Sequence, residues 1–425
     1  MNRKKKFILP VLLMLSYLGS QAQFTMDGQL RPRFEYRDGY KIQADSTTNP
    51  AFVTAQRSRL NLNYKKDKLK VKFSIQDVRV WGETKNKNDS PGIGVHEAWS
   101  EILFTENYSL KLGRQELKYD DKRILSWNNW NNIGSSHDLA LLKYDKSKLQ
   151  VHFGLAYNND VLKNFESNYP VDFYKAMQFL WFSKEFSNGL NFSLIELADG
   201  HQKHGSSNFV YTRVTYGGNI GFKNDSSKVN LYGTIYLQGG KDKTGKDINS
   251  NFFSVKASYK LSEKIKPSAG IDYFSGNDAM DTNNTYNNAF SNLYGTGHGY
   301  YGSMDYFTVV DKHTLGGGLI DIYGKIDYKF SDKTSASATY HTFSLSNNVL
   351  DPDYTGTGLK AIDKNLGSEV DLMFNYKYSD EIDLKFGYSV MFAKESMNVI
   401  KGGDHNELAN WAFVMLTFKP AFIKN

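Results

Sequence analysis

The chain has 425 residues, with 52 basic and 45 acidic side chains, 35 glycines, 8 prolines and no cysteine. Without cysteine the protein forms no disulfide and accepts no lipid on a thiol, so an exported form must be held together by other contacts. Aromatic residues make up 15% of the chain, more than an ordinary soluble domain needs, and the many glycines and few prolines suit strands joined by turns.

The first 22 residues have the layout of a secretory signal peptide. Met1–Lys6 is basic, the next 13 residues are apolar, and Ser20-Gln21-Ala22 is a small-x-small cleavage site. The apolar stretch is too short to cross a bilayer as a helix, which takes about 20 residues. Cleavage would remove Arg3 and three lysines but no acid, which lowers the net charge from +7 to +3. The charge of the mature chain therefore gives no support to nucleic-acid binding.

The mature chain is predicted to open with a strand whose two faces are strictly separated. Over Phe24–Asp38, apolar, aromatic or proline residues alternate with polar ones, and Gly28 is the one exception. The polar face carries Arg31, Arg33 and Arg37. A period of two is typical of a strand with one face in lipid and the other in water.

The same alternation recurs to the C-terminus, with no convincing amphipathic helix and no later apolar stretch long enough for a membrane helix. In residues 381–395, for example, Leu384 and Phe386 alternate with Asp383 and Lys385. Eighteen strands are predicted, over residues 24–38, 51–65, 68–82, 95–105, 108–117, 138–145, 148–158, 175–186, 189–199, 207–223, 228–239, 251–262, 264–275, 316–330, 333–345, 366–378, 381–395 and 409–419.

Short and long connections alternate between these strands. Eight connections are turns of three to six residues, such as 262–264 and 331–333, and nine are longer loops rich in Asn and Gly, such as 276–315 and 346–365. With both termini on the short-turn side, this asymmetry is typical of an outer-membrane barrel, whose short turns face the periplasm.

We therefore predict an all-β fold, in which residues 23–425 form a single transmembrane antiparallel β-barrel of about 18 strands. A soluble β-sandwich also alternates, but it does not need aromatic residues at so many outward positions. A barrel of this size is wide enough for an aqueous channel unless a loop plugs it. The last strand, Trp411–Phe418, is expected to close the barrel against Phe24–Asp38 and to carry the aromatic signal that barrel-assembly machinery reads.

Arginine is concentrated at the start of the mature chain. Eight of the nine mature arginines precede residue 124, whereas lysine is spread throughout. Arg57 and Arg59 lie on the polar face of their strand. In residues 69–81 the apolar positions change from odd to even, which predicts a β-bulge near Gln76 that turns Asp77 and Arg79 inward.

These arginines are predicted to form a basic arc on one wall of the lumen. Arginine keeps its charge and binds carboxylates through two parallel hydrogen bonds, which lysine does not match. The same lumen is expected to hold acids such as Glu35, Glu97 and Glu101, so an alternative role for the arginines is to form ion pairs that stiffen the wall.

Other motifs give weaker signals. Residues 297–302 (GHGYYG) match G-x-G-x-x-G, but they lie in a long loop with no helix after them, which argues against nucleotide binding. Ser136, His137 and Asp138 are adjacent in sequence and point to alternate sides of a strand, so they do not form a triad together. We therefore expect no enzyme activity, no cofactor and no metal site.

Several segments resemble the alginate-export family of outer-membrane barrels, in its Bacteroidetes-type branch. The resemblance covers essentially the whole mature chain and is most specific in GRQELKYDD and in the LYGTGH…MDYF block. The matching segments are LRPRFEYRDGY (30–40), QRSRLNLNY (56–64), QDVRVWGE (76–83), LKLGRQELKYDDKRI (110–124) and LYGTGHGYYGSMDYF (293–307). Two positions depart from the family pattern: Ser126 stands where glycine is usual, and Ser135 where arginine is frequent.

The resemblance implies an eighteen-stranded barrel whose arginine-rich pore conducts an acidic polysaccharide. By position in the matching segments, the pore-lining role falls on seven arginines. These are Arg31, Arg33, Arg57, Arg59, Arg79, Arg114 and Arg123. The two departures would weaken the outer part of this basic track.

Four functions can be compared with these features. The first is a channel for an anionic polysaccharide or oligosaccharide, and the second is a general or small-solute porin with a preference for anions. An outer-membrane lipase or protease would need a catalytic constellation that is not visible, and a surface-binding barrel would use residues 276–315 to grip a partner. The expected partners are the anionic solute, outer-membrane lipid and barrel-assembly machinery, but not nucleic acid, and the barrel is expected to be a monomer.

Overall fold

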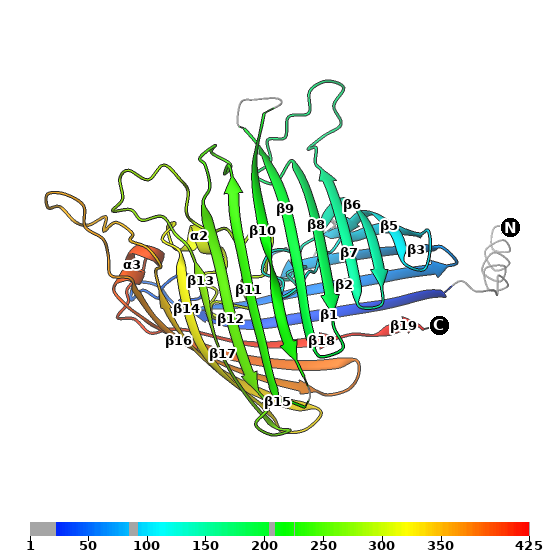
Figure 1. Ribbon diagram of the computed structural model, residues 1–425. Helices are drawn as coiled ribbons and strands as arrows, with labels where there is room; N and C mark the ends of the chain where they lie inside the picture. The colour runs from blue at the N-terminus through cyan, green and yellow to red at the C-terminus, as the bar shows by residue number, and fades with distance from the viewer. Residues whose placement is uncertain (1–22, 85–91, 204–208, 225, 425) are drawn as a thin grey trace, which may run out of the picture.

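The computed structural model describes residues 23–84, 92–203, 209–224 and 226–424. The predicted signal peptide, residues 1–22, lies outside these residues. The described chain forms one antiparallel β-barrel (Figure 1), and the prediction of eighteen barrel strands is confirmed. The strands are β1 (Gln23–Asp38), β2 (Ala51–Lys66), β3 (Leu69–Val80), β4 (Ile93–Leu103), β5 (Tyr108–Gln115), β6 (His137–Lys146), β7 (Leu149–Tyr157), β8 (Ala176–Glu185), β9 (Leu190–Gln202), β10 (Val210–Lys223), β11 (Val229–Gly240), β12 (Ser250–Tyr259), β13 (Ile265–Phe274), β14 (Leu319–Lys329), β15 (Thr334–Ser344), β16 (Asn365–Lys377), β17 (Ile382–Ala393) and β18 (Ala409–Phe418).

The barrel closes between β18 and β1, as predicted. Arg33 lies opposite Met415 and Tyr36 lies opposite Ala412 in this pairing. A short nineteenth strand, β19 (Ala421–Ile423), then continues along β1 with a register shift at Met26. The residues after the last aromatic position of β18 therefore lengthen the seam of the barrel.

The alternation read from the sequence separates lipid-facing from lumenal side chains. In β11, Leu231 and Ile235 are 49% and 56% exposed, whereas Thr234 and Tyr236 point inward and are buried. An outward apolar face is stable in lipid because every backbone group of a closed sheet is paired with a neighbouring strand.

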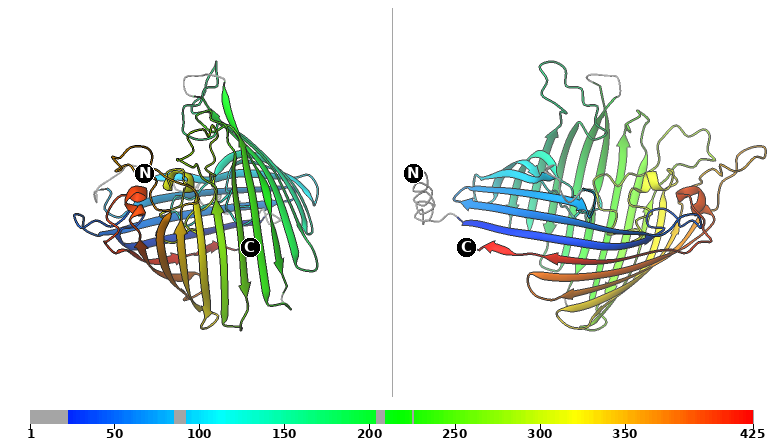
Figure 2. Two further views of the ribbon diagram at one scale, coloured as in Figure 1. Left: turned by 60° about the vertical axis from the view of Figure 1, so that its left-hand side comes forward. Right: turned by 180° about the vertical axis from the view of Figure 1, so that it is seen from behind.

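Short turns gather at one end of the barrel and long loops at the other (Figures 1 and 2), as the alternating connections predict. Two short helices interrupt the long loops, α2 (Val310–His313) and α3 (Ser396–Lys401). In the described part of the chain, no helix is long and apolar enough to cross a membrane.

Two of the long connections fold back into the lumen rather than lying outside it. We call them together the plug, which consists of residues 116–136 and 276–315. Its buried side chains include Leu125, Met304 and Phe307, each at most 1% exposed. The two segments join through a parallel bridge between Leu125 and Tyr294, where the amide of Ser126 donates to the carbonyl of Tyr294 at 3.1 Å. The plug therefore fills part of the lumen with packed side chains.

The prediction of a β-bulge in β3 near Gln76 is wrong. The register of β3 with β2 is unbroken from Leu69 to Val80. The irregularity lies in the partner strand β4, where Ser74 and Ile75 face Glu97 and Val95 and His96 is the extra residue. Arg79 therefore stays on the face of β3 opposite to Gln76, because a bulge in β4 does not change which way β3 side chains point.

Candidate functional site

Two cavities occupy the lumen, one on each side of the plug. The inner cavity measures about 1210 Å³ and is lined by residues of the short turns, whereas the outer cavity measures about 710 Å³ and is lined by residues of the long loops. Trp130 and His298 line both cavities, and their rings stack with centroids 3.8 Å apart. This stack, with one ring from each segment of the plug, separates the two spaces.

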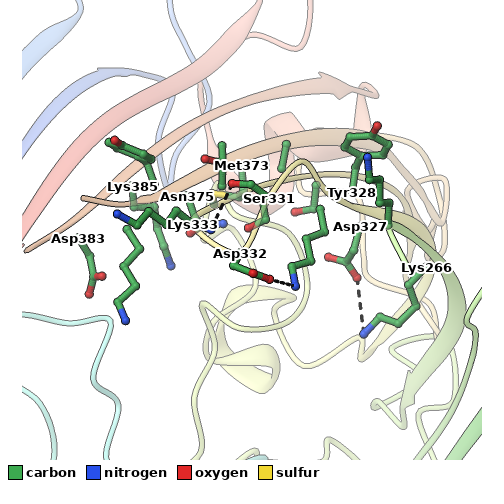
Figure 3. A pocket seen from close by; sticks show the side chains of 18 of the residues that line it. Lys266, Asp327, Tyr328, Ser331, Asp332, Lys333, Met373, Asn375, Asp383 and Lys385 are labelled. Carbon is green, nitrogen blue, oxygen red and sulfur yellow. Dashed lines mark hydrogen bonds and ion pairs between the residues drawn. The ribbon is translucent and has the colours of Figure 1, made fainter. Parts of the chain in front are cut away.

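Lysine dominates the wall of the inner cavity. Figure 3 shows Lys333, Lys385 and Lys266 around it, and Lys266 points toward Asp327. The cavity is lined by eleven lysines: Lys223, Lys228, Lys260, Lys264, Lys266, Lys325, Lys329, Lys333, Lys377, Lys385 and Lys419. Only four acids line it: Glu263, Asp327, Asp332 and Asp383. The inner cavity therefore has a strong excess of positive charge.

These lysines are not predicted as a group from the sequence. They lie on five different strands and the turns between them, and each alone is an ordinary solvated lysine. The feature of the sequence that could have indicated this group is the recurrence of lysine at or next to the short turns, for example Lys264, Lys333 and Lys377. Closure of the barrel brings these separate turns around one space.

Arg31 extends from β1 and binds the plug. Its guanidinium donates to the carbonyl oxygen of Asn129 at 2.7 Å and to those of Trp130 and Asn131 at 3.2 and 3.3 Å. It also donates to Oδ1 of Asn132 at 2.7 Å. Arg31 lies directly opposite Arg57 across the β1–β2 pair.

Arg57 and Arg59 lie two residues apart in β2 and therefore share one face of that strand. Arg57 donates to Oε1 of Gln29 and, at 2.8 Å, to Oδ1 of Asn129 in the plug. Arg59 donates to Oε1 of Gln76 at 2.7 Å and lies 3.5 Å from the carboxylate of Glu116.

Arg33 is part of an ion-pair cluster on the barrel wall. Such a cluster is expected if the arginines form ion pairs that stiffen the wall. Its Nε lies 2.8 Å from Glu35, and Arg37 lies 3.0 Å from the same carboxylate. The indole of Trp411 also donates to Glu35, at 3.0 Å. The guanidinium of Arg33 lies 4.6 Å from the ring of Trp130, so this cluster supports the stack between the cavities.

Arg123 joins the plug to the opposite wall. Its Nη2 lies 2.8 Å from Asp272 of β13, and its Nη1 donates to the phenol oxygen of Tyr301 at 2.7 Å. The guanidinium also lies 3.7 Å from the ring of Tyr300. Burial disfavours its charge, but Asp272 and the other oxygens around it raise the pKa of Arg123 well above its ordinary value. Arg123 is thus a charged link within the closed lumen.

The acidic strands β13 to β16 provide further anchors for the plug. The amide of Met304 donates to Glu369 at 2.8 Å, and that of Ser303 donates to Asp371 at 3.3 Å. The plug is therefore held by arginine side chains on β1 and β2 and by carboxylates on the facing wall.

Arg79 and Arg114 each form an ion pair with a nearby carboxylate. Arg79 pairs with Asp77 at 2.6 Å, and the β2–β3 register places both on the face opposite to Gln76. Arg114 pairs with Asp138 at 2.9 Å and shares a face of β5 with Leu112. Both arginines are among the residues that line the outer cavity.

The three residues Ser136, His137 and Asp138 point apart, as predicted. His137 is buried and bonded to the phenol oxygen of Tyr174 at 2.9 Å, while Asp138 is exposed beside Arg114. Among the residues that the structure describes, no group of three or more His, Cys, Asp or Glu side chains is arranged to hold a metal ion.

The arrangement can attract and hold anions. Both cavities are rich in basic side chains, and a lumen with low-dielectric walls concentrates ions of the opposite sign.

Comparison with known proteins gives a family and a fold. The family described as alginate export matches residues 22–156 and 202–407. No curated protein matches the sequence. The structure of Acinetobacter baumannii OccAB1 has a TM-score of 0.64 at 11% identity, and the match covers 94% of this chain and 97% of that chain. That of Pseudomonas aeruginosa OpdL has a TM-score of 0.62 at 10% identity, with 94% and 99% covered. At such identities the likeness is one of fold alone.

Proposed function

The chain belongs to the alginate export family, and from this premise we propose that it conducts an anionic polysaccharide or oligosaccharide through the outer membrane. The observation that carries this proposal is the inner cavity, where eleven lysines face four acids. Sugar acids carry one carboxylate per residue, so a wall with repeated cationic groups suits a polymer better than a single charged pocket does.

The arginines contribute differently from what the sequence suggested. Arg33 and Arg123 are neutralised by carboxylates, and Arg31 and Arg57 are bound to the plug. In the closed barrel the lysines of the inner cavity are therefore the groups that first meet an anion from the short-turn side.

A channel for small anions is the second candidate. It is favoured by the plug, because Trp130 and His298 leave two separate cavities of limited volume rather than one wide conduit. The two candidates differ in whether a charged oligomer competes for the pore more strongly than a single sugar acid does.

The proposal is tested by reversing charge in the inner cavity. We expect Lys264→Glu, Lys333→Glu and Lys385→Glu together to reverse the anion preference of the channel, because none of these lysines has an ion-pair partner in the described chain. The measurement is the reversal potential in planar bilayers under a salt gradient. The effect should shrink as salt screens charges beyond roughly 8 Å at physiological ionic strength.

Trigalacturonate should block wild-type currents at low salt and lose this effect in the triple variant. Lys246→Glu, on an exposed part of a long loop, is the matched control and should leave both properties unchanged. If galacturonate monomers block as well as the trimer does, the channel is one for small anions. Wild-type currents that neither trigalacturonate nor galacturonate reduces would contradict the proposed function.

The orientation of the barrel predicts where an antibody can bind. A peptide tag inserted between Tyr354 and Gly358, in an exposed long loop, should be reached on intact cells, because long loops face outward in barrels of this kind. A tag in the short turn 331–333 should be reached only after the outer membrane is opened. Surface labelling of the second tag alone would show that the barrel has the opposite orientation.

A further inference from the structure

Ser136 does not pair with the residues next to it in sequence, but it meets a histidine from another strand. Its hydroxyl oxygen lies 3.3 Å from Nδ1 of His96. The other ring nitrogen of His96, Nε2, lies 2.7 Å from the carboxylate of Glu116. A hydroxyl, an imidazole and a carboxylate in this order are the groups that activate a serine for attack on a carbonyl carbon.

The ends of three neighbouring strands bring these groups together. His96 lies near the start of β4, Glu116 follows the last residue of β5, and Ser136 precedes the first residue of β6. β5 pairs with both β4 and β6. His96 and Glu97 are both buried, although neighbours in a regular strand face opposite sides. The bulge in β4, whose extra residue is His96, makes this possible, and such bulges often re-aim a side chain beside an active site.

The carboxylate of Glu116 sets which nitrogen of His96 carries the hydrogen. It lies 3.5 Å from Nη1 of Arg59, so the acid is held between a cation and the ring. Because a carboxylate accepts hydrogen bonds, we assign the ring N–H to Nε2, which leaves Nδ1 beside Ser136 without a hydrogen. Nδ1 is then able to take the proton of the Ser136 hydroxyl.

A substrate reaches Ser136 from the outer cavity, which this residue lines. Among the described residues, five basic side chains and two acidic ones line the same space. The basic residues are Arg33, Arg37, Lys41, Arg79 and Arg114, and the acids are Glu83 and Asp305. An excess of positive charge attracts a negatively charged substrate and stabilises the oxyanion that forms when a nucleophile adds to a carbonyl group.

We propose that Ser136, His96 and Glu116 form a site that hydrolyses carboxylic esters with a negatively charged alcohol part, such as an acylated sugar acid. Ser136 is the nucleophile, His96 is its base, and Glu116 positions the ring of His96. This activity goes beyond conduction, and it does not depend on which solute the channel conducts.

The reaction consists of two acyl transfers. The hydroxyl oxygen of Ser136 bonds to the ester carbonyl carbon while Nδ1 of His96 takes the hydroxyl proton. The bond to the alcohol oxygen then breaks, its electron pair stays on that oxygen, and the proton on Nδ1 passes to it. Water attacks the acyl group left on Ser136 and gives a proton to Nδ1, which returns it to the serine oxygen. The sum is one ester and one water consumed, with one alcohol and one carboxylic acid released.

A fluorophosphonate probe tests whether Ser136 is activated, because such probes bond to nucleophilic serines and lose fluoride. In the detergent-solubilised barrel we expect the probe on Ser136, located by fragmentation of its peptide in a mass spectrometer. Ser135 lines the same cavity, but in the described chain its hydroxyl has no histidine partner, so it should stay unlabelled. Ser135→Ala is the matched control and should be labelled like wild type, whereas Ser136→Ala should not be labelled.

Kinetics separate the roles of His96 and Glu116. Wild type should hydrolyse 4-acetoxybenzoate with a kcat/KM several-fold above that for phenyl acetate, which lacks the negative charge, and high salt should reduce this preference. His96→Gln should lower kcat roughly 100-fold, because the base is lost. Glu116→Gln should lower kcat roughly tenfold and leave KM unchanged, because it alters the orientation of the ring and not the binding of the ester. Heat-dependent electrophoretic mobility confirms that each variant is a folded barrel.

A folded wild-type barrel in which the probe does not label Ser136 would overturn the proposal. So would ester hydrolysis that is as fast in Ser136→Ala as in wild type. Ser136→Ala should still conduct ions and be blocked by trigalacturonate like wild type, so loss of hydrolysis alone leaves the proposed function standing. A wild-type barrel that hydrolyses the ester but is not blocked by trigalacturonate or by galacturonate would contradict the proposed function and support the esterase site.

Discussion

Deletion of residues 409–425 is expected to abolish insertion of the barrel into the outer membrane. The deletion removes β18, which pairs with β17 on one side and with β1 on the other. Both neighbours would then present unpaired backbone groups to lipid, where each unpaired group costs several kcal/mol. Trp411, whose indole binds Glu35 and whose ring stacks on Tyr40, is lost as well.

Insertion is measured by the shift in electrophoretic mobility between heated and unheated outer-membrane fractions. A shorter deletion of residues 422–425 is the control and should still insert. It shortens β19, which pairs with β1 at only two positions, Met26 and Asp27, and it leaves the β18 register untouched. A folded, inserted product from the longer deletion would show that β18 does not close the barrel.

Arg123→Ala is expected to release the plug and to raise the open fraction and the conductance of single channels several-fold. Removal of the guanidinium leaves Asp272 buried without its cation and Tyr301 without its partner. Breaking a buried ion pair by removing one member costs roughly 3–5 kcal/mol. The strand pairings do not involve this side chain, so the barrel should still assemble while the plug becomes less stable in its docked position.

A combined variant shows whether the ion pairing of Arg123 is what holds the plug in its docked position. Arg123 pairs with Asp121 at 3.0 Å as well as with Asp272. Arg123→Met combined with Asp272→Leu and Asp121→Asn removes all three charges, and replacing a buried ion-pair group with neutral side chains is often neutral for stability. This triple variant should remain closed more often than Arg123→Ala alone. Arg37→Ala, which removes a half-buried partner of Glu35 on the wall, should behave like wild type. Wild-type conductance from correctly inserted Arg123→Ala would show that other contacts hold the plug.

The fold was largely predictable because strand alternation is a local property. A side chain in a strand faces the side opposite to its neighbour's, so the positions of Leu231 and Ile235 against Thr234 and Tyr236 already separate lipid from lumen. The same rule placed Arg31, Arg57 and Arg59 on the lumenal face. Applied to an unbroken β3, the rule also places Arg79 on the correct face, opposite to Gln76. The inward orientation was predicted only because a change in apolar parity was taken for a bulge in β3, whereas the bulge lies in β4.

The site depended instead on contacts between residues far apart in the chain. The sequence by itself determined the strands and which residues share a face of each strand. It did not determine that residues 116–136 and 276–315 turn inward, because the contacts that hold them, such as that between Arg123 and Asp272, join positions 149 residues apart. Only the tertiary structure decided that the lysines of separate turns surround one cavity and that Arg31 and Arg57 bind neutral oxygens of the plug. The physical reason is that alternation fixes the direction of each side chain, whereas the partner it meets depends on how the closed barrel and its inserted loops pack together.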